Sequence, residues 1–170
     1  MSNSFKYFVE GPCEKALIKA FMFTDGKHFK HGKVEVFNFI NERISKAKAR
    51  TINKDNVVAI VFDTDVENIE ILEENINVLK KVSLLTDEHI LIVPSIKTFE
   101  DELVYSCSKI SNINQLFNTK SVKEFKTKFI KHTEIVAKLE QSEFMLEKIW
   151  SRKPTGIFSK YQNDGPRIKQ

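Results

Sequence analysis

The order of apolar and polar residues along this 170-residue chain predicts strands that alternate with helices. Continuous apolar runs at 56–62 (NVVAIVF) and 89–94 (HILIVP) are typical of strands buried on both faces, as in parallel sheets covered by helices. The aromatic and β-branched segment 5–10 (FKYFVE) and the segment 34–39 (VEVFNF) predict two further strands. The chain thus offers four candidate strands in its first half.

Helices are predicted between these strands. Pro12 favours a helix start after the first strand, because proline fits the first helical position. A polar loop is expected at 24–33, and residues 41–50 have a polar, helical pattern. Residues 66–81 form an amphipathic helix whose apolar face is Ile69, Leu72, Ile76 and Leu79. This β-α-β-α-β-α-β order predicts an α/β fold with an open, mainly parallel four-stranded sheet and right-handed crossovers.

The second half of the chain lacks strand signals. Residues 97–150 predict a helical appendage, with Thr98 as N-cap of its first helix and Ser142 as cap of a last short helix. The tail, 151–170, contains prolines and glycines without periodicity. We expect it to be irregular or mobile, so that deleting it leaves the fold intact. The α/β domain then occupies residues 1–96.

Composition restricts the class of protein. Hydrophobic residues make up 41% and charged residues 29% of the chain, which is ordinary for a soluble globular protein. No apolar run approaches the ~20 residues of a membrane span, and the N-terminus lacks a signal-peptide pattern. Cys13 and Cys107 are too few for a disulfide scaffold or a thiolate zinc site. We therefore expect two reduced thiols in a cytoplasmic protein.

Charge is unevenly placed along the chain. Five basic residues and one acidic residue after Trp150 account for the whole formal net charge of +4, so the body of the protein is neutral. This differs from the overall basicity of a protein that coats nucleic acid.

Carboxylates follow two of the predicted strands. Ligands of open α/β sheets bind beyond the carboxyl ends of the strands. The first strand delivers Glu10 to that edge, and the third delivers Asp63 and Asp65, which leave an extended chain on the same side. If these strands are neighbours, the three carboxylates repel one another and their pKa values rise unless a cation offsets the charge. Mg²⁺ (or Mn²⁺), held by carboxylates, waters and phosphates, is the natural compensation.

These motifs resemble the Toprim family, found in topoisomerases, bacterial primases, OLD-type nucleases and ribosomal-RNA maturases. In that family a glutamate follows the first strand, as in FVEGPCE here, and an Asp-x-Asp follows the third, as in AIVFDTD. The resemblance covers roughly residues 5–95. It implies a Toprim-like (Rossmann-like) fold, Glu10 as general acid/base or metal ligand, and Asp63 and Asp65 as the Mg²⁺-binding pair. Many members have a glycine shortly after the Asp-x-Asp, where this chain has Val66-Glu67-Asn68.

Each of these acidic residues also has a structural explanation. Asp63 and Asp65 could form a turn that caps the helix at 66–81. Glu10 could be an exposed carboxylate near a helix N-terminus. Three further acidic residues could support the metal-binding residues from behind, although acidic side chains in the first turn of a helix are explained more simply by their favourable interaction with the helix dipole. They are Glu14, Glu100 and Glu102.

Basic residues offer a candidate nucleic-acid surface. Phosphate contacts with lysine release counterions, and aromatic residues between basic ones suit stacking of single-stranded bases. Such residues are equally typical of a solvated helix face or of a tail docked on its own body or on a partner protein. The candidates are Lys126, Lys128, Lys131, Arg152, Lys153 and Lys160.

The resemblance implies a small Mg²⁺-dependent nuclease that acts on DNA or RNA, in phage defence or RNA processing, beside a partner ATPase encoded elsewhere. A topoisomerase is disfavoured because it also needs a tyrosine nucleophile on a separate domain. A primase is disfavoured because the chain carries no zinc-ribbon module. The alternative is a non-catalytic module that keeps the fold and binds nucleic acid or a protein.

Overall fold

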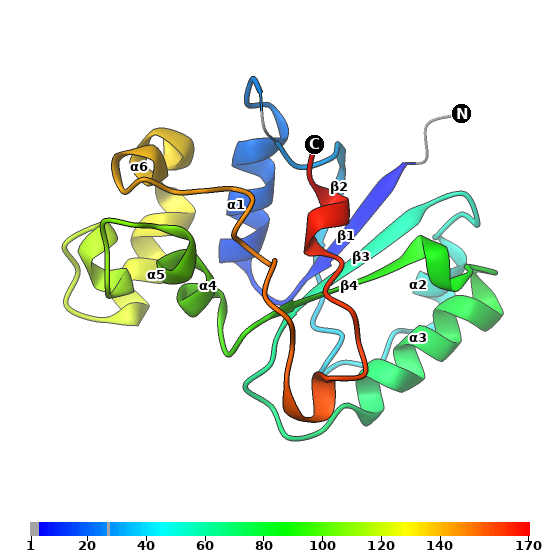
Figure 1. Cartoon of the computed structure of the whole chain (residues 1–170). Helices are drawn as coiled ribbons and strands as arrows, with labels where there is room; N and C mark the ends of the chain where they lie inside the picture. Colours follow the sequence, from blue (N-terminus) through cyan, green and yellow to red (C-terminus); the bar gives the residue numbers. More distant parts are fainter. Residues whose placement is uncertain (1–3, 27) are drawn as a thin grey trace.

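Four parallel strands form one sheet at the centre of the protein (Figure 1). The computed structural model describes residues 4–26 and 28–170, so Lys27 of the predicted 24–33 loop lies outside the described residues. The sheet order is β2-β1-β3-β4. Its members are β1 (Phe5–Val9), β2 (Gly32–Val36), β3 (Val57–Asp63) and β4 (Ile90–Ser95). The predicted α/β fold with a four-stranded parallel sheet is confirmed, and its architecture is Rossmann-like.

β3 lies in the interior of the sheet, as its uninterrupted apolar run predicts. It pairs with β1 on one side, where Val9 is in register with Val61, and with β4 on the other, where Asp63 is in register with Ser95. Ala59 and Val61 are almost completely buried. A half-exposed strand would alternate apolar and polar residues instead.

Helices cover both faces of this sheet (Figure 1). One face carries α1 (Pro12–Met22), α4 (Phe99–Ser106), α5 (Val122–Lys131) and α6 (Ile135–Gln141). The other carries α2 (Lys46–Arg50) and α3 (Glu70–Val82). Ala59 and Val61 point to the first layer and Val58 and Ile60 to the second, because strand side chains alternate. Across the part of the chain that is described, no helix combines the length and apolar character needed to cross a membrane.

Local capping explains where several helices begin. Proline occupies the first turn of α1 as predicted. The Thr98 hydroxyl accepts a hydrogen bond from the Asp101 backbone N–H at 3.3 Å, which confirms the predicted cap of α4. α3 begins at Glu70 rather than at 66, and the side chain of Asn68 accepts the Glu70 N–H at 2.7 Å. Asp63 and Asp65 therefore do not cap this helix.

The predicted helix at 41–50 is wrong over its first half, because α2 starts only at Lys46. The buried Asn75 side chain holds the preceding chain as a loop. It accepts the Ile44 N–H at 2.8 Å and donates to the carbonyls of Phe39 and Glu42. Satisfying those buried backbone groups outweighs the weak helical pattern.

The predicted last helix after Ser142 is also wrong. Ser142 ends α6 instead of starting a helix, and the chain up to Trp150 forms turns. Glu143 and Trp150 have positive φ angles of 54° and 51°, which a helix does not permit. The buried Glu102 carboxylate fixes this path by accepting the Trp150 N–H at 2.9 Å.

The tail is irregular, as predicted, but it packs on the body. Asp164 covers the outer edge of β4: its N–H donates to the Ile92 carbonyl at 2.8 Å, and its carboxylate accepts the Ile92 N–H at 2.9 Å. Phe158 packs against Phe62, and Ile168 is fully buried. The tail therefore contributes buried apolar side chains to the core, which argues against the expectation that its deletion leaves the fold intact.

Phe158→Ala should destabilise the protein by about 3 kcal/mol, because it removes a buried ring from the core under the sheet. Ile157→Ala is the matched control: its side chain is 43% exposed, so the change should stay within about 0.5 kcal/mol. Urea unfolding of both variants measures the difference. Equal stabilities would show that the tail is dispensable after all.

Candidate functional site

Four carboxylates meet at the carboxyl edge of the sheet, and we call them the acidic cluster. Glu10 follows β1 and Asp63 ends β3, while Glu14 and Glu100 lie in the first turns of α1 and α4. The charges of Glu14, Glu10 and Glu100 all raise the pKa of Asp63, after the larger effect of its burial. The cluster thus joins residues up to 90 positions apart in the sequence.

The pairing of β1 with β3 produces the central contact of this cluster. Val9 is in register with Val61, so Glu10 follows β1 close to the point where β3 ends. Its carboxylate oxygen Oε2 accepts the backbone N–H of Asp63 at 3.0 Å. The two strand ends are therefore joined by a charge-assisted hydrogen bond.

Asp65 differs from the four carboxylates in its exposure to solvent. The chain leaves the strand at Thr64, whose N–H donates to the carbonyls of Ser95 and Lys97 at 3.1 and 2.9 Å. The charge of Asp65 is not among those that shift the pKa of Asp63. The extended chain, on which we based the expectation that Asp63 and Asp65 point the same way, ends at Asp63, because the chain bends at Thr64.

Asp63 is the most strongly perturbed carboxyl group of the cluster. Burial, followed by the charges of its acidic neighbours, raises its pKa to about 8. Its oxygen Oδ1 is buried and has no hydrogen-bond partner among residues 4–26 and 28–170. The hydroxyl of its cross-strand neighbour Ser95 acts in the opposite direction on the pKa, and Ser95 itself accepts the Trp150 indole N–H at 3.1 Å. Burial and the acidic neighbours therefore favour the protonated form of Asp63 when no metal is bound.

Glu14 is buried beside Glu10. Burial raises its pKa to about 7, its own backbone N–H lowers it, and the charges of Glu10 and Glu100 raise it further. Gly11 leaves room for this side chain, since a Cβ at that position would lie 3.1 Å from Glu14 Oε2. Glu14 is thus part of the cluster and more than a complement to the helix dipole.

Lys126 reaches the cluster from α5. Its ammonium nitrogen Nζ lies 3.1 Å from Glu100 Oε1. Partial burial lowers the pKa of Lys126, but Glu100 more than compensates and the pKa is raised overall. The nearby Cys13 thiol has its pKa raised to about 12, chiefly by burial, so it is not a reactive thiolate.

Glu102 and Arg152, both candidates from the sequence, bind each other instead of joining the site. The Glu102 carboxylate is fully buried and accepts Arg152 Nη2 at 2.9 Å and the Ile96 N–H at 2.8 Å. The Arg152 guanidinium also stacks over the Tyr105 ring at 4.3 Å. This network holds the start of the tail against α4.

The remaining basic candidates lie on the surface. Lys128 pairs with Glu124 one helical turn away, at 3.2 Å, and Lys160 pairs with Glu73. Lys131 and Lys153 are exposed. Of the six candidates, Lys126 is the one that the structure brings to the acidic cluster.

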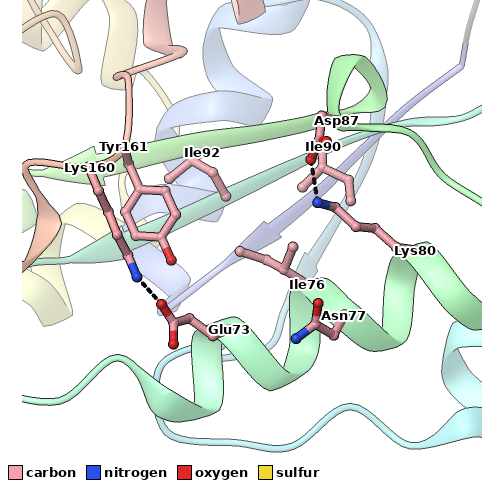
Figure 2. Close-up of a pocket in the computed structure, with 9 residues that line it drawn as sticks. All are labelled: Glu73, Ile76, Asn77, Lys80, Asp87, Ile90, Ile92, Lys160 and Tyr161. Atoms are coloured by element: carbon pink, nitrogen blue, oxygen red, sulfur yellow. Dashed lines mark hydrogen bonds and ion pairs between the residues drawn. The ribbon is translucent and has the colours of Figure 1, made fainter.

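A groove of about 430 Å³ lies on the α3 side of the sheet, away from the cluster (Figure 2). Its apolar residues are Ile76, Ile90 and Ile92, with the Tyr161 ring beside Ile92. Ion pairs flank it, Lys160 with Glu73 and Lys80 with Asp87. Because these charges cancel, the groove offers no net charge to attract a phosphate or a cation.

The cluster has the donors that a hard divalent cation prefers, since Mg²⁺ and Mn²⁺ bind carboxylate oxygens. The orphaned Asp63 Oδ1 fits such an ion. Within the described ranges, however, no three His, Cys, Asp or Glu side chains already stand at ligand spacing. Glu10 and Asp63, whose chain positions are joined by the hydrogen bond from the Asp63 N–H to Glu10 Oε2, are the residues that would hold a cation.

Comparisons of this chain with protein-family models, with curated proteins and with solved structures give no match.

The metal-free protein should lose stability as the pH rises. In the unfolded chain Asp and Glu release their protons near pH 4, whereas folded Glu14 and Asp63 keep theirs to about 7 and about 8. Between these limits the unfolded state binds fewer protons, so rising pH favours unfolding. Melting temperatures measured in chelator from about pH 5 to about pH 8 should fall.

Asp63→Asn and Glu14→Gln should each flatten that pH dependence, because they remove a carboxyl group with a raised pKa. The same melts, repeated on both variants, test the assignment. A wild-type melting temperature that climbs over this range would contradict the buried acidic cluster.

Proposed function

We propose that this protein is a metal-dependent phosphodiesterase that cleaves DNA or RNA, with a Toprim-like fold. The observation that carries this proposal is the convergence of Glu10, Glu14, Asp63 and Glu100 at the carboxyl edge of a parallel sheet. Like charges gathered in a desolvated place destabilise the metal-free protein. A bound cation would remove that penalty.

The proposed roles follow from the position of each side chain. Asp63 and Glu10 are the proposed ligands of Mg²⁺ or Mn²⁺. The cation would orient a phosphate and stabilise charge on the departing oxygen. Glu10 uses Oε2 to accept the Asp63 N–H, which fixes the direction of its carboxylate. As general acid/base it would accept a proton from the attacking water or protonate the leaving oxygen.

The second candidate is a non-catalytic Toprim-like module that binds nucleic acid or a protein. Its support is the exposure of Asp65, together with the absence, within the described residues, of three acidic, His or Cys side chains at ligand spacing. For this candidate, nucleic-acid binding without cleavage and without any response to chelator is expected. A cleavage assay on single- and double-stranded DNA and RNA, with Mg²⁺ and with chelator, decides between the two.

Asp63→Asn should raise the melting temperature of the metal-free protein, because it removes a carboxyl group whose ionisation is opposed by burial and by its acidic neighbours in the folded state. The same change should weaken Mn²⁺ binding at least about tenfold and abolish cleavage. Asp65→Asn should weaken Mn²⁺ binding less, because Asp65 is exposed and its charge does not shift the pKa of Asp63. Calorimetric titration and thermal melts measure both effects. Wild-type Mn²⁺ affinity in Asp63→Asn would sink the metal-site proposal.

Glu10→Gln should leave the fold intact, because the amide oxygen can still accept the Asp63 N–H. Cleavage should fall by roughly 10²- to 10⁴-fold, the usual contribution of a general acid/base. Single-turnover cleavage rates at saturating Mg²⁺ separate this loss from weaker metal binding. An unchanged rate would remove Glu10 from the chemistry.

A further inference from the structure

One cation already lies at the acidic cluster. Lys126 Nζ is 3.1 Å from Glu100 Oε1, and the Glu100 side chain is only 10% exposed. The charge of Lys126 also acts on Glu14, whose pKa it lowers against the effects of burial and the acidic neighbours. In the metal-free protein this ammonium therefore supplies part of the positive charge that the carboxylates lack.

Lys126 is able to leave this position. Its own side chain is 51% exposed, and it is a flexible stem rooted on the solvent side of α5. Its head can move into water by rotation about side-chain bonds, with no change in the helix. The buried Glu100, in contrast, is held at the start of α4.

A divalent cation and the Lys126 ammonium compete for the same carboxylates. Both are stabilised by the negative charge of Glu100 and Glu14, and both are positive, so they repel each other at close range. Binding of the ion therefore favours release of the ammonium from Glu100. The released head stays on α5, whose neighbouring lysines Lys123 and Lys131 are exposed.

We propose that Lys126 is a displaceable internal counter-ion, which pairs with Glu100 in the metal-free protein and is released to bind a nucleic-acid phosphate when a divalent cation enters the acidic cluster. The inference rests on the proposed function, because it requires the cluster to bind a cation. It adds a coupling: metal and nucleic acid strengthen each other's binding through one side chain. By thermodynamic reciprocity the two effects are of equal size.

The test is a calorimetric titration with Mn²⁺ of the full-length wild type, Lys126→Met and Lys128→Met. Lys126→Met should tighten Mn²⁺ binding by roughly three- to tenfold, because it removes the competitor and a repelling charge. Lys128→Met is the matched control from the same helix: its ion pair is with the exposed Glu124, so Mn²⁺ affinity should stay within about twofold. A lysine that only contacts substrate would leave the affinity unchanged.

The coupling is measured by repeating the titrations with a short phosphorothioate oligonucleotide that resists cleavage. Wild-type protein should bind Mn²⁺ at least about threefold more tightly in its presence. Lys126→Met should lose this gain, whereas Lys128→Met should keep it. A gain of the same size in Lys126→Met would overturn the proposed release of Lys126 to phosphate.

A double variant separates the effect of Lys126 on Mn²⁺ binding from a loss of folding stability. Removing Lys126 leaves the buried Glu100 without its ion pair, which can destabilise the protein. Lys126→Met/Glu100→Gln removes both charges. Relative to Glu100→Gln alone, its Mn²⁺ affinity should rise by less than the affinity rises when Lys126→Met is made in the wild type, since Lys126 has no ion pair to compete through. A rise of the same size in both backgrounds would contradict the role of this ion pair.

The outcomes separate the two proposals. Wild-type protein that does not bind Mn²⁺ would overturn both the metal site and the counter-ion. Wild-type protein that binds Mn²⁺ and cleaves nucleic acid, with equal or weaker Mn²⁺ affinity in Lys126→Met, would overturn the counter-ion alone.

Discussion

The pairing of β3 with β1 on one side and with β4 on the other is the constraint on which both the fold and the site depend. It buries β3 on both faces and brings the ends of three strands to one edge. Asp63 closes the buried strand, so its carboxyl group is desolvated by the same packing that stabilises the sheet. The site is thus a direct consequence of strand order. Any ion that binds the folded protein there would raise its free energy of unfolding.

The helices after β4 complete this edge in two different ways. Glu100 and Glu102 are two residues apart in the first turn of α4, yet they have separate partners. Glu100 lies beside the acidic cluster and pairs with Lys126, whereas Glu102 binds Arg152 and the Trp150 N–H. One carboxylate therefore adds charge to the site, and the other ties the tail to the body. Since the tail also covers the edge of β4, the segment after Trp150 supports the strand that carries Ser95.

The sequence was informative where the structure follows from a local pattern. It was uninformative where the structure depends on packing between residues far apart in the chain. Apolar runs predicted β3 and β4. The rule that sites lie beyond the carboxyl ends of parallel strands predicted that Glu10 lies near Asp63. The loop at 39–44 was missed because a buried Asn75 from α3 determines it. Phe158 was missed because a single anchoring ring has no periodicity. The approach of Lys126 to Glu100 was equally hidden, since it depends on how α5 packs beside α4.

A purely structural explanation of the acidic cluster meets a physical objection. Asp63 does not cap α3, because the N-cap position is Ile69 and the first helical N–H, that of Glu70, donates to Asn68 Oδ1. Its Oδ1 has no partner within the described chain, although an asparagine could occupy the place without charge repulsion. The raised pKa values of Asp63 and Glu14 mean that these carboxyl groups oppose folding at neutral pH. Groups that weaken the fold are typical of a functional site, and carboxylates are the donors that the proposed divalent cation would use.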